Sequence, residues 1–262
     1  MRSNKAALLI VFLFAVSTAV FTYFYKKDVE EKIDNFQNYQ MEFRGGTTHK
    51  EKKAVREPGA AEKKVDSGKI PEQILIDVPF APQAPYAVWD EYHKEACEEA
   101  SLMMLKYYLD DKKLTPEIAE REIQNMISFQ VEEYGDYKDS DAEEIVELAS
   151  DFYGIKNLKV VYDFKKEDIK KELTKGFPII VPAAGRLLGN PFYTSPGPLY
   201  HNLVLVGYEN DVIITNDPGT KRGGGYRYNI DVLYNAIHDF PGKKELIEEG
   251  KKAMIIVDIN NK

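Results

Sequence analysis

Apolar residues recur at helical spacing in the first half of the folded region. The segment CEEASLMMLKYYL places apolar side chains at positions 97, 100, 103, 104, 107 and 108, which predicts one buried face of a helix. A second helix is expected to begin with Thr115 as its cap and Pro116 at its first position. A third is expected at Ser140, where Ser140 and Glu143 form an S-x-x-E capping box. A short strand at residues 73–79 and a proline-rich loop precede these helices.

The second half of the chain has the pattern of strands. Runs rich in β-branched and aromatic residues occur at 158–163, 177–184, 201–208, 211–217, 225–230 and 253–259. Helical patterns at 165–175 and 230–238 separate some of them. Because successive strands are joined by short links, we expect an antiparallel sheet. A helical front half followed by a strand-rich back half indicates the α+β class.

Residues 6–25 form an uncharged apolar run, AALLIVFLFAVSTAVFTYFY, which as a helix would span a hydrocarbon core of ~30 Å. A removable signal peptide is the alternative, because Ser17 and Ala19 resemble a cleavage site. The run continues past them, so an uncleaved signal anchor is favoured. We therefore expect a single-pass protein of the cell membrane with its folded part outside the cytoplasm, or a secreted protein if the segment is removed. Basic residues on both sides of the run leave the orientation open.

The chain is expected to divide into an anchor at 1–25, a flexible polar tether at 26–70 and a folded domain at 71–262. The tether shows no sustained apolar period. Of the 35 Lys plus Arg and 43 Asp plus Glu in the chain, the first 70 residues hold 13 and 9, so 22 and 34 remain and the domain has a formal charge of −12. This acidity argues against nucleic acid or anionic lipid headgroups as its ligand.

Cys97 is the single cysteine of the chain, which excludes an intramolecular disulfide and any zinc site built from several thiolates. We expect neither a metal nor a cofactor. Asp136, Asp139 and Asp141 cluster before the third helix, but the glycine and distant glutamate of a calcium loop are missing, so helix capping is the better interpretation. A lone cysteine is either a buried core residue or a reactive group.

A reactive thiol needs a nearby imidazole, and the imidazole needs a carboxylate or amide that fixes its tautomer. Among the four histidines, His201 is the best placed. It opens the apolar strand NLVLVGY directly after the flexible run TSPGPLY, so its ring is expected at the rim of a buried sheet. The next strand ends in Asn216 and Asp217.

The turn between these two strands decides which side chain meets His201. With a two-residue loop, the residue numbers of two cross-strand partners add up to an odd number. Asp217 then lies on the face opposite to His201, and Asn216 becomes the better partner. With a three-residue loop at 209–211, or with a bulge, Asp217 becomes the same-face diagonal neighbour of His201. Asn210 tolerates the left-handed conformation that such a loop needs.

Three ordered blocks, VPFAPQAP at 78–85, ACEEASLMMLKYY at 96–108 and YHNLVLVGYENDVIITNDPG at 200–219, resemble the bacteriocin-processing type of cysteine peptidase domain and its relatives, the thirty-ninth cysteine peptidase family. The resemblance covers roughly residues 75–259. It implies a papain-like fold, with a helical front half packed on an antiparallel sheet. It also implies four roles: Cys97 as nucleophile, His201 as general base and later acid, Asp217 as orienting group, and Gln83 as a side-chain donor to the oxyanion.

The function implied by this resemblance is that of a bacterial, membrane-anchored thiol hydrolase that cleaves a peptide or amide bond through a Cys-His-Asp triad. One departure is that Glu98 and Glu99 stand where family members usually carry glycine. Two carboxylates beside a thiol oppose thiolate formation unless they face solvent or a substrate cation. The transporter helices and GxxxxGK[ST] phosphate loop of leader-cleaving exporters are also not seen in this chain, so the substrate stays open.

Two other functions are compatible with the same residues. One is a catalytically silent module whose acidic surface binds a basic peptide or protein, and the other is a cell-wall peptide amidase or acyl transferase that uses the same triad. The stretch 184–200 is either a substrate-facing flap, with Phe192, Tyr193 and Tyr200 as peptide contacts, or a simple connection. Trp89 either packs over its own loop or lines a cleft.

Overall fold

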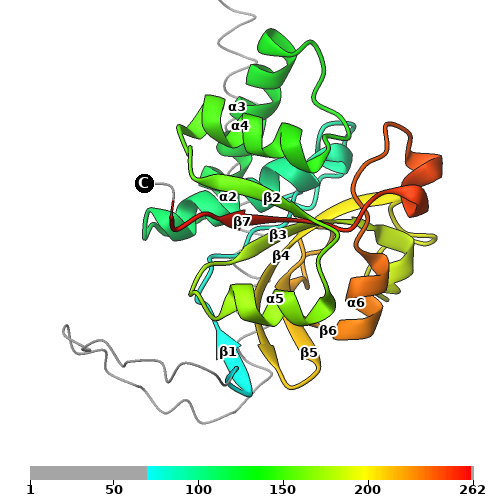
Figure 1. Ribbon diagram of the computed structural model, residues 1–262. Helices are drawn as coiled ribbons and strands as arrows, with labels where there is room; N and C mark the ends of the chain where they lie inside the picture. The colour runs from blue at the N-terminus through cyan, green and yellow to red at the C-terminus, as the bar shows by residue number, and fades with distance from the viewer. Residues whose placement is uncertain (1–69, 261–262) are drawn as a thin grey trace, which may run out of the picture. The chain divides into compact units, whose positions relative to one another are not determined.

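Seven antiparallel strands form the centre of the structure (Figure 1). The computed structural model describes residues 70–260. The strands are β1 Gln73–Leu75, β2 Leu158–Tyr162, β3 Ile179–Ala184, β4 Tyr200–Glu209, β5 Val212–Asn216, β6 Gly224–Asn229 and β7 Ala253–Val257. Their order is β2-β7-β3-β4-β5-β6, and β1 pairs with the end of β4. The predicted antiparallel sheet and α+β class are therefore confirmed, although β1 is shorter than expected.

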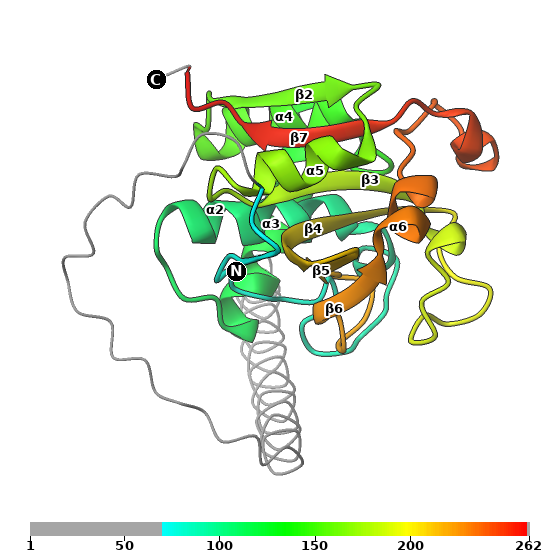
Figure 2. The ribbon, with the colours of Figure 1, turned by 60° about the horizontal axis from the view of Figure 1, so that its bottom comes forward.

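Helices cover both faces of this sheet. They are α2 Cys97–Leu109, α3 Pro116–Glu133, α4 Ala142–Tyr153, α5 Lys166–Leu173 and α6 Ile230–Ala236, with the short 3₁₀ helices η1 His93–Glu95, η2 Gly185–Leu188 and η3 Lys244–Glu249. Figures 1 and 2 show α2, α3 and α4 gathered on one side of the sheet, and α5 and α6 on the other. Because α2 lies between the sheet and α3, its first residue is held at the end of the central strand β4.

Helix α2 is more deeply buried than its apolar stripe predicts. Every residue from Cys97 to Leu105 is buried, so the first turns are enclosed on all sides rather than along one face. Met103 and Met104 are fully enclosed in the main core, as the apolar spacing predicts, and so is Leu102, which lies off that spacing. The all-round burial also takes in the two carboxylates that follow Cys97, which an amphipathic pattern does not foresee.

The helix caps confirm one prediction and correct another. Thr115 caps α3, with its Oγ1 accepting a hydrogen bond from the backbone N–H of Ile118 at 3.3 Å. At α4 the predicted box of Ser140 and Glu143 is wrong, because Asp141 and Glu144 form it one residue later at 2.8 and 2.9 Å. A carboxylate is a stronger acceptor than a hydroxyl, which favours Asp141 as the cap.

The turn between β4 and β5 combines a short loop with a bulge. Glu209 pairs with Val212, so the loop has two residues rather than the three of one alternative considered from the sequence. Asn210 has the expected left-handed conformation, with φ at 50°. A register shift between positions 205 and 207 then changes the pairing, which is the second route considered from the sequence. The bulge brings Asp217 to the face that carries His201.

Strand β1 explains why the bulge occurs where it does. The carbonyl of Val206, the extra residue, accepts a hydrogen bond from the N–H of Ile76 at 2.7 Å. Beside it, a Cβ at Gly207 would lie 2.2 Å from the carbonyl oxygen of Ile74, so only glycine admits this close approach of β1. The register of the β4–β5 hairpin thus depends on a segment more than a hundred residues earlier in the chain.

The predicted membrane span at 6–25 and nearly all of the predicted tether at 26–70 lie outside the described residues. Within residues 70–260, no helix is both long enough and apolar enough to cross a membrane.

Candidate active site

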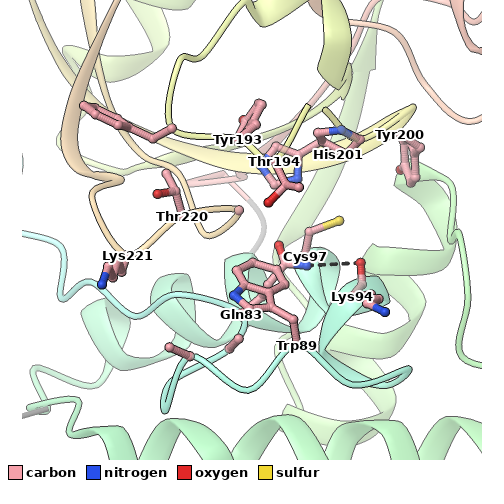
Figure 3. A pocket seen from close by; sticks show the side chains of 15 residues that line it. Gln83, Trp89, Lys94, Cys97, Tyr193, Thr194, Tyr200, His201, Thr220 and Lys221 are labelled. Atoms are coloured by element: carbon pink, nitrogen blue, oxygen red, sulfur yellow. Dashed lines mark hydrogen bonds between the residues drawn. The ribbon is translucent and has the colours of Figure 1, made fainter. Parts of the chain in front are cut away.

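A cavity of about 600 Å³ lies where the start of α2 meets the first residues of β4 and the turn after β5. Three of the four residues singled out from the sequence line it: Gln83, Cys97 and His201 (Figure 3). The fourth, Asp217, has no exposed surface and is hydrogen-bonded to the ring of His201. The structure therefore brings all four together at one place.

His201 and Asp217 form a buried pair. Nε2 of His201 lies 2.8 Å from Oδ1 of Asp217, and their side chains are 2 % and 0 % exposed. Gly219 makes room for this pair, because a Cβ there would lie 2.8 Å from Cε1 of the imidazole. The backbone N–H of Gly219 also donates to Oδ1 of Asp217 at 3.0 Å. Since Nε2 is bound to the carboxylate, Nδ1 is the ring nitrogen left to exchange a proton with a reacting group.

Three further donors converge on the second oxygen of Asp217. The hydroxyls of Tyr193 and Tyr228 donate to Oδ2 at 2.6 and 2.7 Å, and Nδ2 of Asn190 donates at 3.1 Å. Burial alone would raise the pKa of the Asp217 carboxyl, but the interaction with His201 and the tyrosine hydroxyls lower it below its ordinary value. Asp217 is therefore held as a carboxylate in one orientation.

Two of these donors, Asn190 and Tyr228, are not found by reading the sequence for chemistry. Asn190 lies in the connection between β3 and β4, and Tyr228 lies in β6, which pairs with β5. Nδ2 of Asn190 also donates to the hydroxyl of Tyr228 at 2.9 Å. For Tyr228, the signal in the sequence was the alternation of side chains along β6, which places every second side chain on one face. This alternation does not show which of the two faces contacts Asp217.

Cys97 is the first residue of α2, and its thiol donates to the carboxylate of Glu98. Sγ lies 3.0 Å from Oε2, and the backbone of Asn202 also forms a hydrogen bond with the thiol, which lowers its pKa. Burial and the neighbouring Glu98 raise the pKa of the Cys97 thiol well above its ordinary value. The positive end of the α2 dipole acts in the opposite direction.

Glu98 and Glu99 are both buried, with 2 % and 0 % of their surfaces exposed. Oε1 of Glu99 accepts a hydrogen bond from Nε2 of Gln130 at 2.6 Å, whereas its Oε2 has no partner. Burial, together with Glu99, raises the pKa of Glu98 well above its ordinary range, and burial raises the pKa of Glu99 to about 7. Neither carboxyl faces solvent, so both oppose ionisation of the adjacent thiol whenever they are charged.

The amide of Gln83 is turned differently from what an oxyanion donor requires. Its Nε2 donates to the carbonyl oxygens of His93 at 2.8 Å and Lys94 at 3.2 Å, and the second of these bonds is visible in Figure 3. Its buried Oε1 has no hydrogen-bond partner. The expectation of an amide N–H presented to the cavity is therefore not met in this arrangement, because both amide hydrogens are already used.

Aromatic side chains line much of the remaining wall. Phe192, Tyr193 and Tyr200 lie in or next to the connection between β3 and β4 and contribute to the lining, so this stretch borders the cavity rather than only joining two strands. The ring of Tyr193 packs edge-on against His201, with centroids 5.5 Å apart. Trp89 lines the cavity from the opposite loop while 41 % exposed, which decides between the two positions considered for it.

His93 lies close to Cys97 in sequence but serves the fold. Its buried ring contacts Oδ1 of Asp90 at 2.8 Å through Nδ1 and Oε2 of Glu120 at 3.1 Å through Nε2. These contacts fasten η1 to α3 and leave both ring nitrogens engaged. His93 is therefore not an alternative base for Cys97.

The comparison with protein-family models agrees with the resemblance seen in the motifs. The model of the Peptidase_C39 like family matches residues 75–240. A candidate C39-like peptidase from Bacillus anthracis is 14% identical, with a TM-score of 0.46, over 70% of this chain and 97% of that one. A double glycine motif protease from an AMS/PCAT transporter, solved in complex with the leader peptide, is 17% identical, with a TM-score of 0.37, over 70% and 91%. No curated protein matches the chain.

Proposed function

The chain belongs to the Peptidase_C39 like family of cysteine peptidases, and on that basis we propose that it hydrolyses a peptide or amide bond with Cys97 as nucleophile, His201 as base and Asp217 as orienting group. The observation that carries this proposal is the buried pair of His201 and Asp217, with Nε2 2.8 Å from Oδ1, in a cavity that Cys97 also lines. A thiol, an imidazole and a carboxylate in this order are the parts that thiol hydrolysis requires.

The first step is proton transfer from Sγ of Cys97 to Nδ1 of His201. The carboxylate of Asp217 stabilises the resulting imidazolium, and the five hydrogen bonds that it accepts keep it from turning. The thiolate then attacks the carbonyl carbon of the substrate, forming a C–S bond and an oxyanion. The imidazolium gives its proton to the leaving amine, and water releases the acyl group in a second round of the same chemistry.

The oxyanion needs donors near Sγ. The first N–H groups of a helix have no intrahelical acceptor, so the N–H of Cys97 at the start of α2 is one suitable donor. We assign Gln83 as the second donor, with the oxyanion replacing the carbonyl of Lys94, the longer of its two present bonds at 3.2 Å. The backbone N–H of Gln83 is bound to the carbonyl of Pro218 at 2.9 Å, which fixes its loop to the turn that follows β5.

The contact between Cys97 and Glu98 defines a resting form in this proposal. To react, Sγ leaves the carboxyl of Glu98 and turns toward Nδ1 of His201. Burial and Glu99 favour the neutral acid form of Glu98, which lessens its repulsion of a thiolate. The high pKa of the thiol therefore belongs to the resting form. The ion pair of the Cys97 thiolate and the His201 imidazolium forms only after the thiol has turned.

A catalytically silent peptide-binding module is the second candidate. The observation that favours it is the hydrogen bond between Cys97 and Glu98, because a thiol bound to a buried carboxyl does not ionise readily. The two functions differ in whether Cys97 reacts with electrophiles in a His201-dependent manner.

The chain also carries a predicted uncleaved anchor at 6–25 and a tether at 26–70, and we propose that they hold the hydrolase at the outer side of the cell membrane. The support is the length and apolarity of the run. Membrane fractionation with N-terminal sequencing tests it: the intact N-terminus should stay with the membrane and the domain should be cut by external protease. A soluble product that begins shortly after Ala19 would show cleavage instead.

Peptide hydrolysis is tested with the full chain in detergent and a pool of fluorescence-quenched peptides of mixed sequence. We expect turnover that is abolished in Cys97→Ala, Cys97→Ser and His201→Ala. Glu132→Gln is the matched control, because Glu132 is exposed on α3, away from the cavity lining. Binding of the peptides to wild type without turnover would identify the silent module.

A further inference from the structure

The charged side chains that line the cavity are both basic. Lys94 and Lys221 belong to its wall, and no Asp or Glu does within the described part of the chain. The domain around them carries 22 basic and 34 acidic residues between 71 and 262, a formal charge of −12. The cavity wall is thus positively charged, whereas the domain as a whole is negatively charged. The two lysines therefore determine which charge of ligand the cavity attracts.

The two lysines flank the reacting groups. Lys94 lies on η1 and Lys221 on the turn that follows β5, and Figure 3 shows them on opposite sides of Cys97. Both residues are exposed and line the cavity. A peptide laid across Cys97 would pass one lysine on the side of the acyl group and the other on the side of the leaving amine.

The backbone under each lysine is fixed to the catalytic residues. The carbonyl of Lys94 accepts the amide hydrogen of Gln83 at 3.2 Å. The turn that carries Lys221 is closed by the hydrogen bonds Asp217 N to Gly223 O and Gly223 N to Thr220 O, both 3.0 Å. Each ammonium group therefore starts from a fixed point relative to Cys97, which restricts the substrate positions that it reaches.

A third cation and aromatic rings complete this surface. The guanidinium of Arg222 stacks over the ring of Phe192, 4.8 Å from its centroid, and Phe192 lines the cavity. Phe192 and Trp89 both line the cavity and are each 41 % exposed, so their rings offer apolar surface to a ligand. The wall thus combines apolar surface for a side chain with cations at both ends.

We infer that the cleft selects peptides that carry a carboxylate side chain on each side of the scissile bond, next to an apolar or aromatic residue. This inference rests on the proposed function for the cleavage itself, but the charge preference is a property of binding. It is opposite to the basic peptide that the net charge of the domain would attract. Because both lysines are exposed, each contributes about two- to fivefold, and the two together contribute about tenfold.

The test uses the full chain and pools of quenched peptides in which one position at a time is fixed as Glu, Gln or Lys. We expect kcat/KM for the best Glu pool at either position to exceed that of the matching Gln pool by about two- to fivefold in low salt, and this ratio to shrink as salt is added. Lys94→Glu and Lys221→Glu should each reverse the preference at one position, in favour of the Lys pool. Lys113→Glu, an exposed lysine beyond the end of α2, is the control and should leave the preference unchanged.

Equal cleavage of Glu and Gln pools, or a preference for Lys in wild type, overturns the inference. So does a reversal that occurs equally in Lys113→Glu, because it would report net charge rather than position. If no pool is cleaved, the hydrolase proposal fails, and fluorescence anisotropy of the labelled Glu, Gln and Lys peptides with the Cys97→Ala chain decides the charge preference separately. Tighter binding of the Glu peptides, weakened by Lys94→Glu, supports it, and equal binding contradicts it.

Discussion

The thiol of Cys97 donates a hydrogen bond to Glu98, with Sγ 3.0 Å from Oε2, at the start of a helix whose residues 97–105 are all buried. A glycine at position 98 would remove the carboxyl that competes with the imidazole of His201 for the thiol. With glutamate there, burial and the adjacent carboxyl raise the pKa of the thiol. Formation of the thiolate is therefore the step on which the activity of this chain depends.

Replacement of Glu98 by glutamine is expected to make Cys97 more reactive. Glutamine keeps the shape but cannot ionise, so the charge that Glu98 acquires as pH rises no longer opposes the thiolate, and the midpoint of the alkylation rate against pH should move down by about one unit. At a pH below both midpoints this corresponds to about a tenfold faster reaction with iodoacetamide. Glu132→Gln, an exposed residue of α3, serves as the control, and coincident profiles for wild type and Glu98→Gln would contradict the prediction.

Tyr228→Phe is expected to weaken the hold on Asp217. The lost hydroxyl donates to Oδ2 at 2.7 Å, and a hydrogen bond to a charged group is worth about 1–3 kcal/mol of unfolding free energy. Because its pKa is lowered in the folded state, Asp217 stabilises the fold above its unfolded pKa, and this contribution is lost as pH falls through the folded pKa. With one donor fewer, acid unfolding should begin at a higher pH, and kcat should fall about tenfold.

The matched control for that variant is Tyr226→Phe. Tyr226 lies two residues earlier in β6 and its ring packs on Tyr228, with centroids 4.7 Å apart. It has the same chemistry on the same strand but does not donate to Asp217 in the structure. Equal losses of kcat and of acid stability in the two variants would contradict the claim that the hydroxyl of Tyr228 holds Asp217.

Glu99→Gln is expected to change how stability depends on pH. The pKa of Glu99 is raised from 4.5 to about 7, so the folded state holds its proton more tightly than the unfolded state does. Its favourable contribution is complete below pH 4.5 and is lost as pH rises through about 7. The Tm of wild type should therefore fall across this window relative to that of Glu99→Gln, in which Gln130 keeps an amide oxygen to donate to. Parallel Tm curves would show that Glu99 does not titrate in this window.

Gln83→Ala separates an oxyanion donor from a structural amide. If the side chain donates in the transition state, kcat should fall about a hundredfold while KM changes little. If it only supports the carbonyls of His93 and Lys94, the main effect should be a lower Tm, with kcat close to that of wild type. The second outcome would leave the N–H of Cys97 as the donor.

Much of the fold follows from local patterns. The bounds of α2 coincide with the run of apolar spacing from Cys97 to Leu109, and Thr115 caps α3 as expected. Local patterns failed where two acceptors competed, as at the start of α4, where Asp141 is the cap one residue after Ser140. Adjacent candidates of similar propensity are separated by tertiary contacts, and Tyr200 donates to the carbonyl of Ser140 at 2.6 Å.

The site depends on contacts that no local pattern contains. The bulge in β4 determines the face on which Asp217 lies. The bulge in turn depends on the close approach of the β1 backbone to Gly207. The burial of Glu98 follows from the enclosure of α2 between the sheet and α3, and not from its own polarity. The sequence could therefore identify the candidate residues by type and order, but the state of the thiol depends on the packing around it.

The most direct test of the account is the rate of iodoacetamide alkylation of Cys97 across pH, measured on the full chain in wild type and in His201→Ala. The account predicts a wild-type reaction that persists below the ordinary thiol pKa of about 8.5 and is lost in His201→Ala, because the imidazole takes the thiol proton. Identical profiles, with no reaction below that pKa in either protein, would contradict the assignment of Cys97 as a nucleophile.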